Sequence, residues 1–233
     1  MDPRKLSSDY GLNERLADSG CAYCGAAPDT ADHVPSKILL DDPLPENLPV
    51  VPACRACNSS FSRDEEYLAC FIECVVVGTA DPDRLSRPKI KQALRHSPGL
   101  AVLIARSCAV VDGNLLWTPD AERVEHVVLK LARGHHLYEL ASPQYEHPDI
   151  LSIVPLVTMS PEGRREFDKG SNLTGWPEIG SRAFLRAVGD GPYAVSAGGW
   201  VEVQAGRYRY SIHEGGLVRI VLGEYLACVV TWE

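Results

Sequence analysis

The sequence of 233 residues contains no apolar run close to the ~18–20 residues that a membrane-spanning helix needs. Its first twenty residues lack the apolar core of a secretory signal peptide, so we expect a cytoplasmic protein with no membrane partner. It has no internal repeat or low-complexity tract, and its 45% hydrophobic and 23% charged residues are ordinary for globular proteins. These properties exclude the fibrous, collagen-like and disordered classes.

Positive charge is also scarce, because 23 Lys and Arg face 31 Asp and Glu, for a net charge of -8. This balance argues against a broadly basic nucleic-acid-binding surface but leaves room for a local basic face. Residues 84–96 are the exception, with five basic side chains and no acidic one: Arg84, Arg87, Lys89, Lys91 and Arg95. We expect this basic segment to bind nucleic acid, although an ordinary solvated helix face would have the same composition.

The cysteines are unevenly distributed, with six of the eight between Cys21 and Cys74. In a reducing cytoplasm, clustered cysteines are more often metal ligands than disulfides. Four of them form two C-x-x-C pairs, which together supply the ligands of a closed tetrahedral zinc site. The segment between the pairs is rich in proline and poor in apolar residues, so buried thiols alone would hold it weakly. We therefore predict a structural zinc bound by Cys21, Cys24, Cys54 and Cys57.

Two other kinds of C-x-x-C site fit the sequence less well. Zinc deaminases combine a P-C-x-x-C segment with H-x-E. Here the residue two positions after His33 is Pro35, and Ala53 separates Pro52 from Cys54. Thioredoxin-like redox sites use one C-x-x-C between a strand and a helix, without a second pair.

Further residues between and after the cysteine pairs complete an ordered pattern. The pattern runs Cys21-x-x-Cys24, Asp32-His33, Asn47-Leu48 and Cys54-x-x-Cys57-Asn58. This series resembles the HNH endonucleases, and especially the zinc-bearing, junction-resolving type with two C-x-x-C knuckles. The resemblance covers residues 17–78 and implies a zinc-stapled HNH nuclease module, in which a β-hairpin and a helix surround a metal (a ββα-metal fold).

The resemblance implies a metal-dependent endonuclease that hydrolyses phosphodiester bonds in nucleic acid, most simply DNA. It gives His33 the role of general base, and Asp32 and Asn58 the role of ligands to a catalytic Mg²⁺ or Mn²⁺. Asn47 would brace the loop that holds His33. The chemistry agrees, since an imidazole with an unperturbed pKa of about 6.5 accepts protons near neutral pH. Carboxylate and amide oxygens suit Mg²⁺ or Mn²⁺. Asp32 points to the other side of an extended strand and cannot compete for the same proton.

A second interpretation remains open, in which the zinc module recognises nucleic acid or protein without cleaving it. Residues 1–75 carry six basic and thirteen acidic groups, and such an acidic surface repels phosphates. An ordinary ion pair would also explain Asp32-His33, a turn would explain Asn47, and a helix cap would explain Asn58.

Helical spacing predicts a helix that begins with a capping box at Ser62 and Glu65 and stops at Gly78. The remaining residues, 79–233, predict a C-terminal α+β domain that serves target choice or assembly, as a homo-oligomer or with a partner protein. Its expected helices are 88–96 and 120–140, the second interrupted by Gly134, and residues 101–111 fit either a helix or a buried strand. Antiparallel strands are expected at 151–159, 200–206, 207–215 and 217–233. The predicted fold class is α+β.

Overall fold

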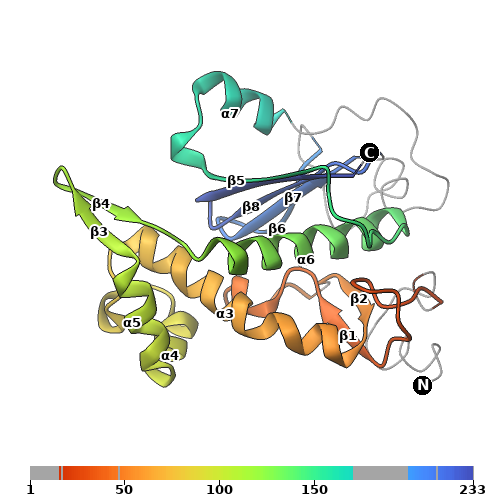
Figure 1. The fold of residues 1–233 in the computed structure, drawn as a ribbon, viewed down its shortest axis with the longest axis horizontal. Coiled ribbons are helices and arrows are strands. Elements are labelled where there is room, and N and C mark those ends of the chain that lie inside the picture. Colours follow the sequence, from red (N-terminus) through yellow and green to blue (C-terminus); the bar gives the residue numbers. More distant parts are fainter. Residues whose placement is uncertain (1–15, 17, 47, 170–198, 214, 233) are drawn as a thin grey trace.

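The computed structural model of the chain describes residues 16, 18–46, 48–169, 199–213 and 215–232 (Figure 1). Its elements in chain order are β1 (Thr30–His33), η1 (Lys37–Leu39), β2 (Val50–Ala53), α3 (Arg55–Val77), η2 (Pro82–Arg84), α4 (Pro88–His96), α5 (Pro98–Arg106), β3 (Cys108–Val111), β4 (Asn114–Trp117), α6 (Ala121–Leu140), β5 (Ile150–Pro155), η3 (Leu156–Thr158), α7 (Pro161–Asp168), β6 (Val201–Gln204), β7 (Tyr208–Ile212), β8 (Val218–Leu222) and β9 (Leu226–Thr231). The described strands form three antiparallel sheets, ordered β1-β2, β3-β4 and β5-β9-β8-β7-β6. The expected mixture of helices and antiparallel sheets is therefore confirmed.

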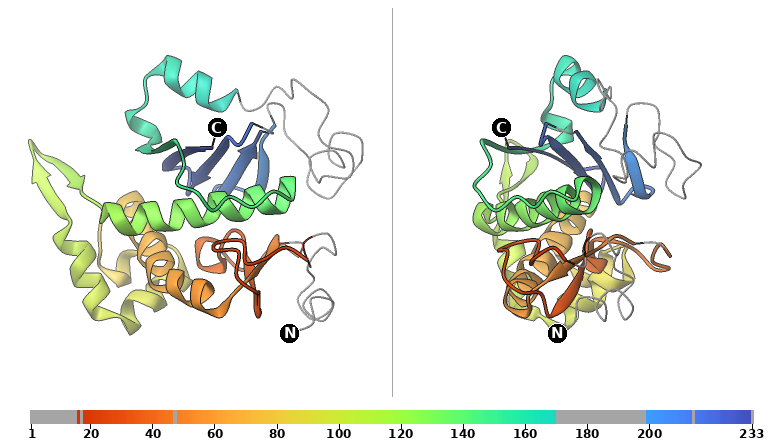
Figure 2. Two further views of the ribbon diagram at one scale, coloured as in Figure 1. Left: turned by 45° about the vertical axis from the view of Figure 1, so that its right-hand side comes forward. Right: turned by 90° about the vertical axis from the view of Figure 1, so that its right-hand side faces the viewer.

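Helix α6 forms the central layer of the molecule. The five-stranded sheet lies on one side of it, and α3 with the β1-β2 hairpin lies on the other (Figures 1 and 2). A helix covered on both sides is apolar around most of its circumference, and nearly every residue from Lys130 to Glu139 is buried. One cluster of buried apolar side chains accordingly extends from Leu16 to Trp232 and includes residues of both predicted parts.

Gly134 allows α6 to approach the end of the hairpin closely. A Cβ atom built on Gly134 would lie 2.6 Å from Cγ2 of Val34, a separation that real Cβ atoms do not adopt. The glycine that interrupts the helical pattern is therefore a packing residue, because only a missing side chain lets Val34 fit against the α6 backbone.

Helix α3 begins earlier than the sequence predicted. It starts at Arg55, with Cys54 as its N-cap, so the Ser62–Glu65 pair lies inside the helix and not at its start. The predicted end is confirmed, because Gly78 adopts a left-handed conformation with φ of 78° and closes the helix. The early start places the second cysteine pair at the helix N-terminus.

The ambiguous apolar run at 101–111 contains both candidate structures. Its first half belongs to α5, and its second half is β3, which pairs with β4. The turn between these strands is Asp112-Gly113, where both residues have positive φ, as a two-residue hairpin turn of type I′ requires. A D-G pair between apolar runs was the available sequence signal for this hairpin.

The C-terminal strands lie where the sequence predicted them, except that the expected strand at 217–233 is divided into β8 and β9 and the one at 151–159 ends at Pro155. Strands β6 to β9 form a meander in which each strand pairs with the next, and β5 pairs with the far side of β9. The turn between β8 and β9 again has two positive φ angles, at Gly223 and Glu224. Among the described helices, none is both long and apolar enough to cross a bilayer.

Candidate metal centre and active site

The four cysteines of the predicted zinc site lie together in the structure. Their sulfur atoms are all within 4.8 Å of one another, and the Sγ atoms of Cys24 and Cys54 are 3.7 Å apart. A tetrahedral zinc with metal–sulfur bonds of ~2.3 Å would place its sulfur ligands about 3.8 Å apart. The cluster of Cys21, Cys24, Cys54 and Cys57 can therefore hold a structural zinc.

Two local structures hold these cysteines in place. The first pair lies in a tight turn in which Gly25, with φ of 73°, donates its N–H to the carbonyl of Cys21 at 2.9 Å. The second pair begins α3, where the backbone N–H of Cys57 points at the Cys54 sulfur at 3.5 Å. That N–H lowers the pKa of the Cys54 thiol, because it stabilises the thiolate that a metal binds. The helix terminus therefore prepares one ligand for metal binding.

The Asp32-His33 pair lies at the end of β1, on the hairpin that joins the two cysteine pairs. Asp32 stands opposite Val51 and His33 opposite Val50 in the antiparallel register. Because neighbouring strand residues point to opposite faces, Asp32 lies on the buried face and is 9% exposed, while His33 is half-buried on the other face.

One oxygen of the Asp32 carboxylate already contacts two protein groups in the structure. Its Oδ2 atom accepts a hydrogen bond of 2.6 Å from the Tyr23 hydroxyl and lies 2.8 Å from Nζ of Lys130. The ammonium supplies the positive charge that the resemblance assigned to a divalent cation. A cation could reach Oδ2 only if Lys130 moved away.

Lys130 is the residue that sequence analysis missed. It extends from α6, is 1% exposed, and also contacts Glu65 at 2.6 Å and the Ser36 hydroxyl at 2.8 Å. Together with Asp32 these acceptors satisfy its three N–H donors. The available signal was its position three residues after Val127 on the apolar face of a helix, where a lysine needs a buried partner.

His33 has the properties of a neutral base. Burial lowers its pKa most and the nearby Lys37 lowers it further, while Asp32 raises it by more than Lys130 lowers it. Its Nδ1 atom is buried and has no hydrogen-bond partner among the described residues. At neutral pH the ring is therefore uncharged and retains an acceptor nitrogen.

Asn58 lies in the first turn of α3 and reaches back to the hairpin. Its Nδ2 atom donates to the Thr30 hydroxyl and to the Ala31 carbonyl, both at 3.3 Å. These bonds leave its Oδ1 atom without a partner among the described groups. Asn58 thus contacts the strand that carries Asp32, but the two residues share no partner in the part of the chain that is described. Asn47, the fourth predicted residue, lies outside the described residues.

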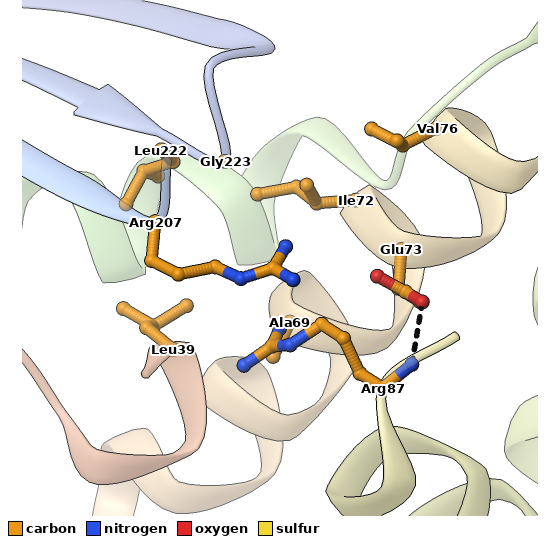
Figure 3. A pocket seen from close by; sticks show the side chains of 9 residues that line it. All are labelled: Leu39, Ala69, Ile72, Glu73, Val76, Arg87, Arg207, Leu222 and Gly223. Atoms are coloured by element: carbon orange, nitrogen blue, oxygen red, sulfur yellow. Dashed lines mark hydrogen bonds between the residues drawn. The ribbon is translucent and has the colours of Figure 1, made fainter. Parts of the chain in front are cut away.

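Arg87 of the basic segment is a structural residue, which corrects its expected role in binding nucleic acid. It is 5% exposed, and its Nε atom donates to Asp41 at 2.6 Å. Its Nη2 atom donates to the Ile38 carbonyl, and its backbone N–H donates to Glu73. Figure 3 shows its guanidinium beside that of Arg207, in a pocket between α3 and the β7-β8 strands. A phosphate cannot reach a side chain buried in this way.

The other four basic side chains divide into two kinds. Lys89 donates to the carbonyls of Lys37 and Leu40 and pairs with Asp42, and Arg95 pairs with Asp83. Arg84 and Lys91 make no ion pair with any described residue and remain available to a ligand.

Comparison of the chain with protein-family models, with curated proteins and with solved structures gives no match. The likeness to HNH endonucleases therefore depends on the motif residues and their geometry.

Proposed function

We propose that this chain is a metal-dependent endonuclease of the HNH type that hydrolyses phosphodiester bonds in nucleic acid, most simply DNA. The observation that carries the proposal is the placement of His33, a half-buried imidazole whose pKa is lowered by burial, next to Asp32 on a hairpin held by the four-cysteine cluster. The order of strand, strand and helix around that cluster supports the same conclusion.

In this proposal His33 removes a proton from the attacking water. Its lowered pKa keeps the ring unprotonated at neutral pH, which a general base requires. The cysteine cluster fixes the β1-β2 hairpin against α3, and this keeps the His33 ring in one position relative to a bound phosphate. Oxygens of Asp32 and Asn58 suit Mg²⁺ or Mn²⁺, which when bound would neutralise charge on the phosphate.

One observation favours a second candidate, a zinc module that binds nucleic acid or protein without cleavage. The Lys130 ammonium, 2.8 Å from Asp32, already balances the carboxylate that a catalytic cation would need. If Lys130 never leaves, the module has no cation site at Asp32. The acidic N-terminal third of the chain agrees with this candidate, because it would weaken contact with phosphates.

Plasmid nicking in Mg²⁺ or Mn²⁺ separates the two candidates. Wild type should nick, and His33→Ala should lose nicking by a factor of about 10² or more, the usual effect of removing a general base. His147→Ala, which removes an exposed histidine, is the matched control and should cut as wild type does. Zinc content and Tm should be unchanged in both variants. Equal nicking by His33→Ala would disprove the proposed base, and binding without nicking by wild type would favour the second candidate.

A further inference from the structure

Tyr23 lies between the two cysteines of the first pair and contacts Asp32 on β1. Its hydroxyl donates a hydrogen bond of 2.6 Å to Oδ2 of Asp32, and the residue is only 5% exposed. The backbone holds this loop against the hairpin, because the N–H of Ala22 donates to the carbonyl of Pro52 on β2 at 2.9 Å. A residue of the zinc loop therefore reaches into the candidate active site.

The Tyr23 hydroxyl is a lasting donor in this contact. Burial, followed by the negative charge of Asp32, raises the pKa of the phenol well above its usual value of about 10, so it keeps its proton at physiological pH. The ring packs edge-on against Phe61 of α3, with 5.0 Å between the ring centroids. Because an ionised carboxylate only accepts hydrogen bonds, the hydroxyl proton must point at Oδ2.

The two oxygens of the Asp32 carboxylate have different surroundings. Oδ2 contacts both Tyr23 and Lys130, whereas Oδ1 accepts no hydrogen bond from any described residue. Oδ1 is also not enclosed by protein, and the Asp32 side chain is 11% exposed. The Oδ1 atom of Asn58 is free as well, because its bonds to β1 use only Nδ2. Two oxygens of the types that Mg²⁺ and Mn²⁺ prefer thus remain available, one on β1 and one on a side chain that contacts β1.

The two groups that contact Oδ2 respond differently to a cation. The ammonium of Lys130 repels a divalent cation near the carboxylate, whereas the Tyr23 hydroxyl has no net charge and does not repel it. Tyr23 can therefore hold Oδ2 whether Lys130 stays or moves away. Carboxylates that bind metals are commonly oriented by hydrogen bonds from groups that do not touch the metal, and loss of such a group typically weakens metal binding about 10–100-fold.

We propose that Tyr23 is a positioning residue of the cation site, in which its hydroxyl holds Oδ2 of Asp32 and leaves Oδ1 as the oxygen that binds Mg²⁺ or Mn²⁺. This role rests on the proposed function, because it requires a cation at Asp32. The first cysteine pair then serves two metal sites. Its sulfur atoms are placed to bind zinc, and the tyrosine between them orients a ligand of the catalytic cation.

Mn²⁺ binding to the full-length zinc-loaded chain, measured by electron paramagnetic resonance of the free ion, tests this role without any cleavage. Tyr23→Phe keeps the ring against Phe61 and removes only the hydroxyl, so zinc content should be unchanged while Mn²⁺ binds at least tenfold more weakly. Tyr67→Phe is the matched control and should bind Mn²⁺ as wild type does, because its buried hydroxyl contacts the N–H of Asp120 and not Asp32. Asp32→Asn should abolish the binding, and adding Tyr23→Phe to it should change nothing further.

A nicking assay separates the role of Tyr23 from the proposed function. The Mn²⁺ concentration for half-maximal nicking should rise at least tenfold in Tyr23→Phe, while the rate at saturating Mn²⁺ should stay near that of wild type. Mn²⁺ binding that depends on Tyr23 in a protein that never nicks would support the positioning role and contradict the proposed cleavage. Three results would overturn the positioning role: no Mn²⁺ binding by wild type, unchanged affinity in Tyr23→Phe or Asp32→Asn, or an equal loss in Tyr67→Phe.

Discussion

Lys130 on α6 forms a buried ion pair with Asp32 on β1, with 2.8 Å between Nζ and Oδ2. The ion pair joins the central helix to the strand that carries the candidate base. Removing one partner of a buried pair leaves an unbalanced charge and costs about 3–5 kcal/mol. We therefore expect Lys130→Met to lower the free energy of unfolding by that amount in denaturant titrations. Lys37→Met, at an exposed lysine, should cost far less, and equal costs would show that the pair contributes nothing.

Lys130→Met also tests whether a divalent cation can bind at Asp32. Lys130→Met leaves the carboxylates of Asp32 and Glu65 without their ammonium, so Mn²⁺ should raise its Tm more than it raises that of wild type. Adding Asp32→Asn to the variant should remove the extra rise. No response to Mn²⁺ in either protein would argue against a cation at Asp32.

Zinc should be required for folding of the N-terminal module. Protein purified without added metal should contain about one zinc per chain, because the cluster is complete in the fold. Cys24→Ser or Cys57→Ser should give protein that is insoluble or cut by proteases, since metal binding energy at such sites is folding energy. Cys108→Ser, outside the cluster, is the control. Folded, metal-free protein would contradict the zinc assignment.

The basic segment should divide into binding and structural residues. Arg84→Ser with Lys91→Ser should weaken nucleic-acid binding and flatten the slope of log affinity against log salt by about two charge contacts, with Tm unchanged. Arg87→Ser should instead lower Tm, because Asp41 and the Ile38 carbonyl lose their buried partner. An unchanged salt slope in the double variant would show that the segment does not touch nucleic acid.

Gly134→Ala should destabilise the protein although alanine is the better helix former. The new methyl group would meet Val34 at 2.6 Å, and such overpacking typically costs about 1–3 kcal/mol. Val34→Ala should lose less stability in the Gly134→Ala background than in wild type, since it makes room for the methyl group. Urea unfolding of the four proteins measures this coupling, and a stabilised Gly134→Ala protein would refute the packing argument.

His136 should make stability fall in mild acid. Burial on α6 lowers its folded-state pKa, so the unfolded chain binds a proton first as the pH falls. The stability that depends on the uncharged His136 ring is fully present above the unfolded-state pKa of about 6.5. It is lost as the pH falls from there toward the folded-state pKa. His136→Gln should flatten this part of the curve of unfolding free energy against pH, whereas exposed His147→Gln should not. Parallel curves for all three proteins would exclude the effect.

Short-range patterns were enough to predict several parts of this protein. The spacing of the four cysteines predicted a cluster that the structure brings together, since each pair needs only one turn of chain. Pro88 at the start of α4 and Gly78 at the end of α3 fix helix boundaries through their own backbone preferences. The C-terminal strands were likewise visible in their β-branched residues and glycine turns.

Residues distant in the sequence decided the rest. No residue near Asp32 in the sequence indicates that Lys130 will neutralise its charge. In the same way, no residue near Arg87 indicates that it will form a buried ion pair with Asp41. Gly134 looks unfavourable in a helix until the structure shows that Val34 packs against it. Composition alone classed Arg87 as a surface cation, because charge in a sequence carries no information about burial. The sequence thus determined the four-cysteine cluster and most of the element types. The packing of α6 decided which charged groups remained available for chemistry, because a buried charge is stable only beside an oppositely charged or hydrogen-bonding group.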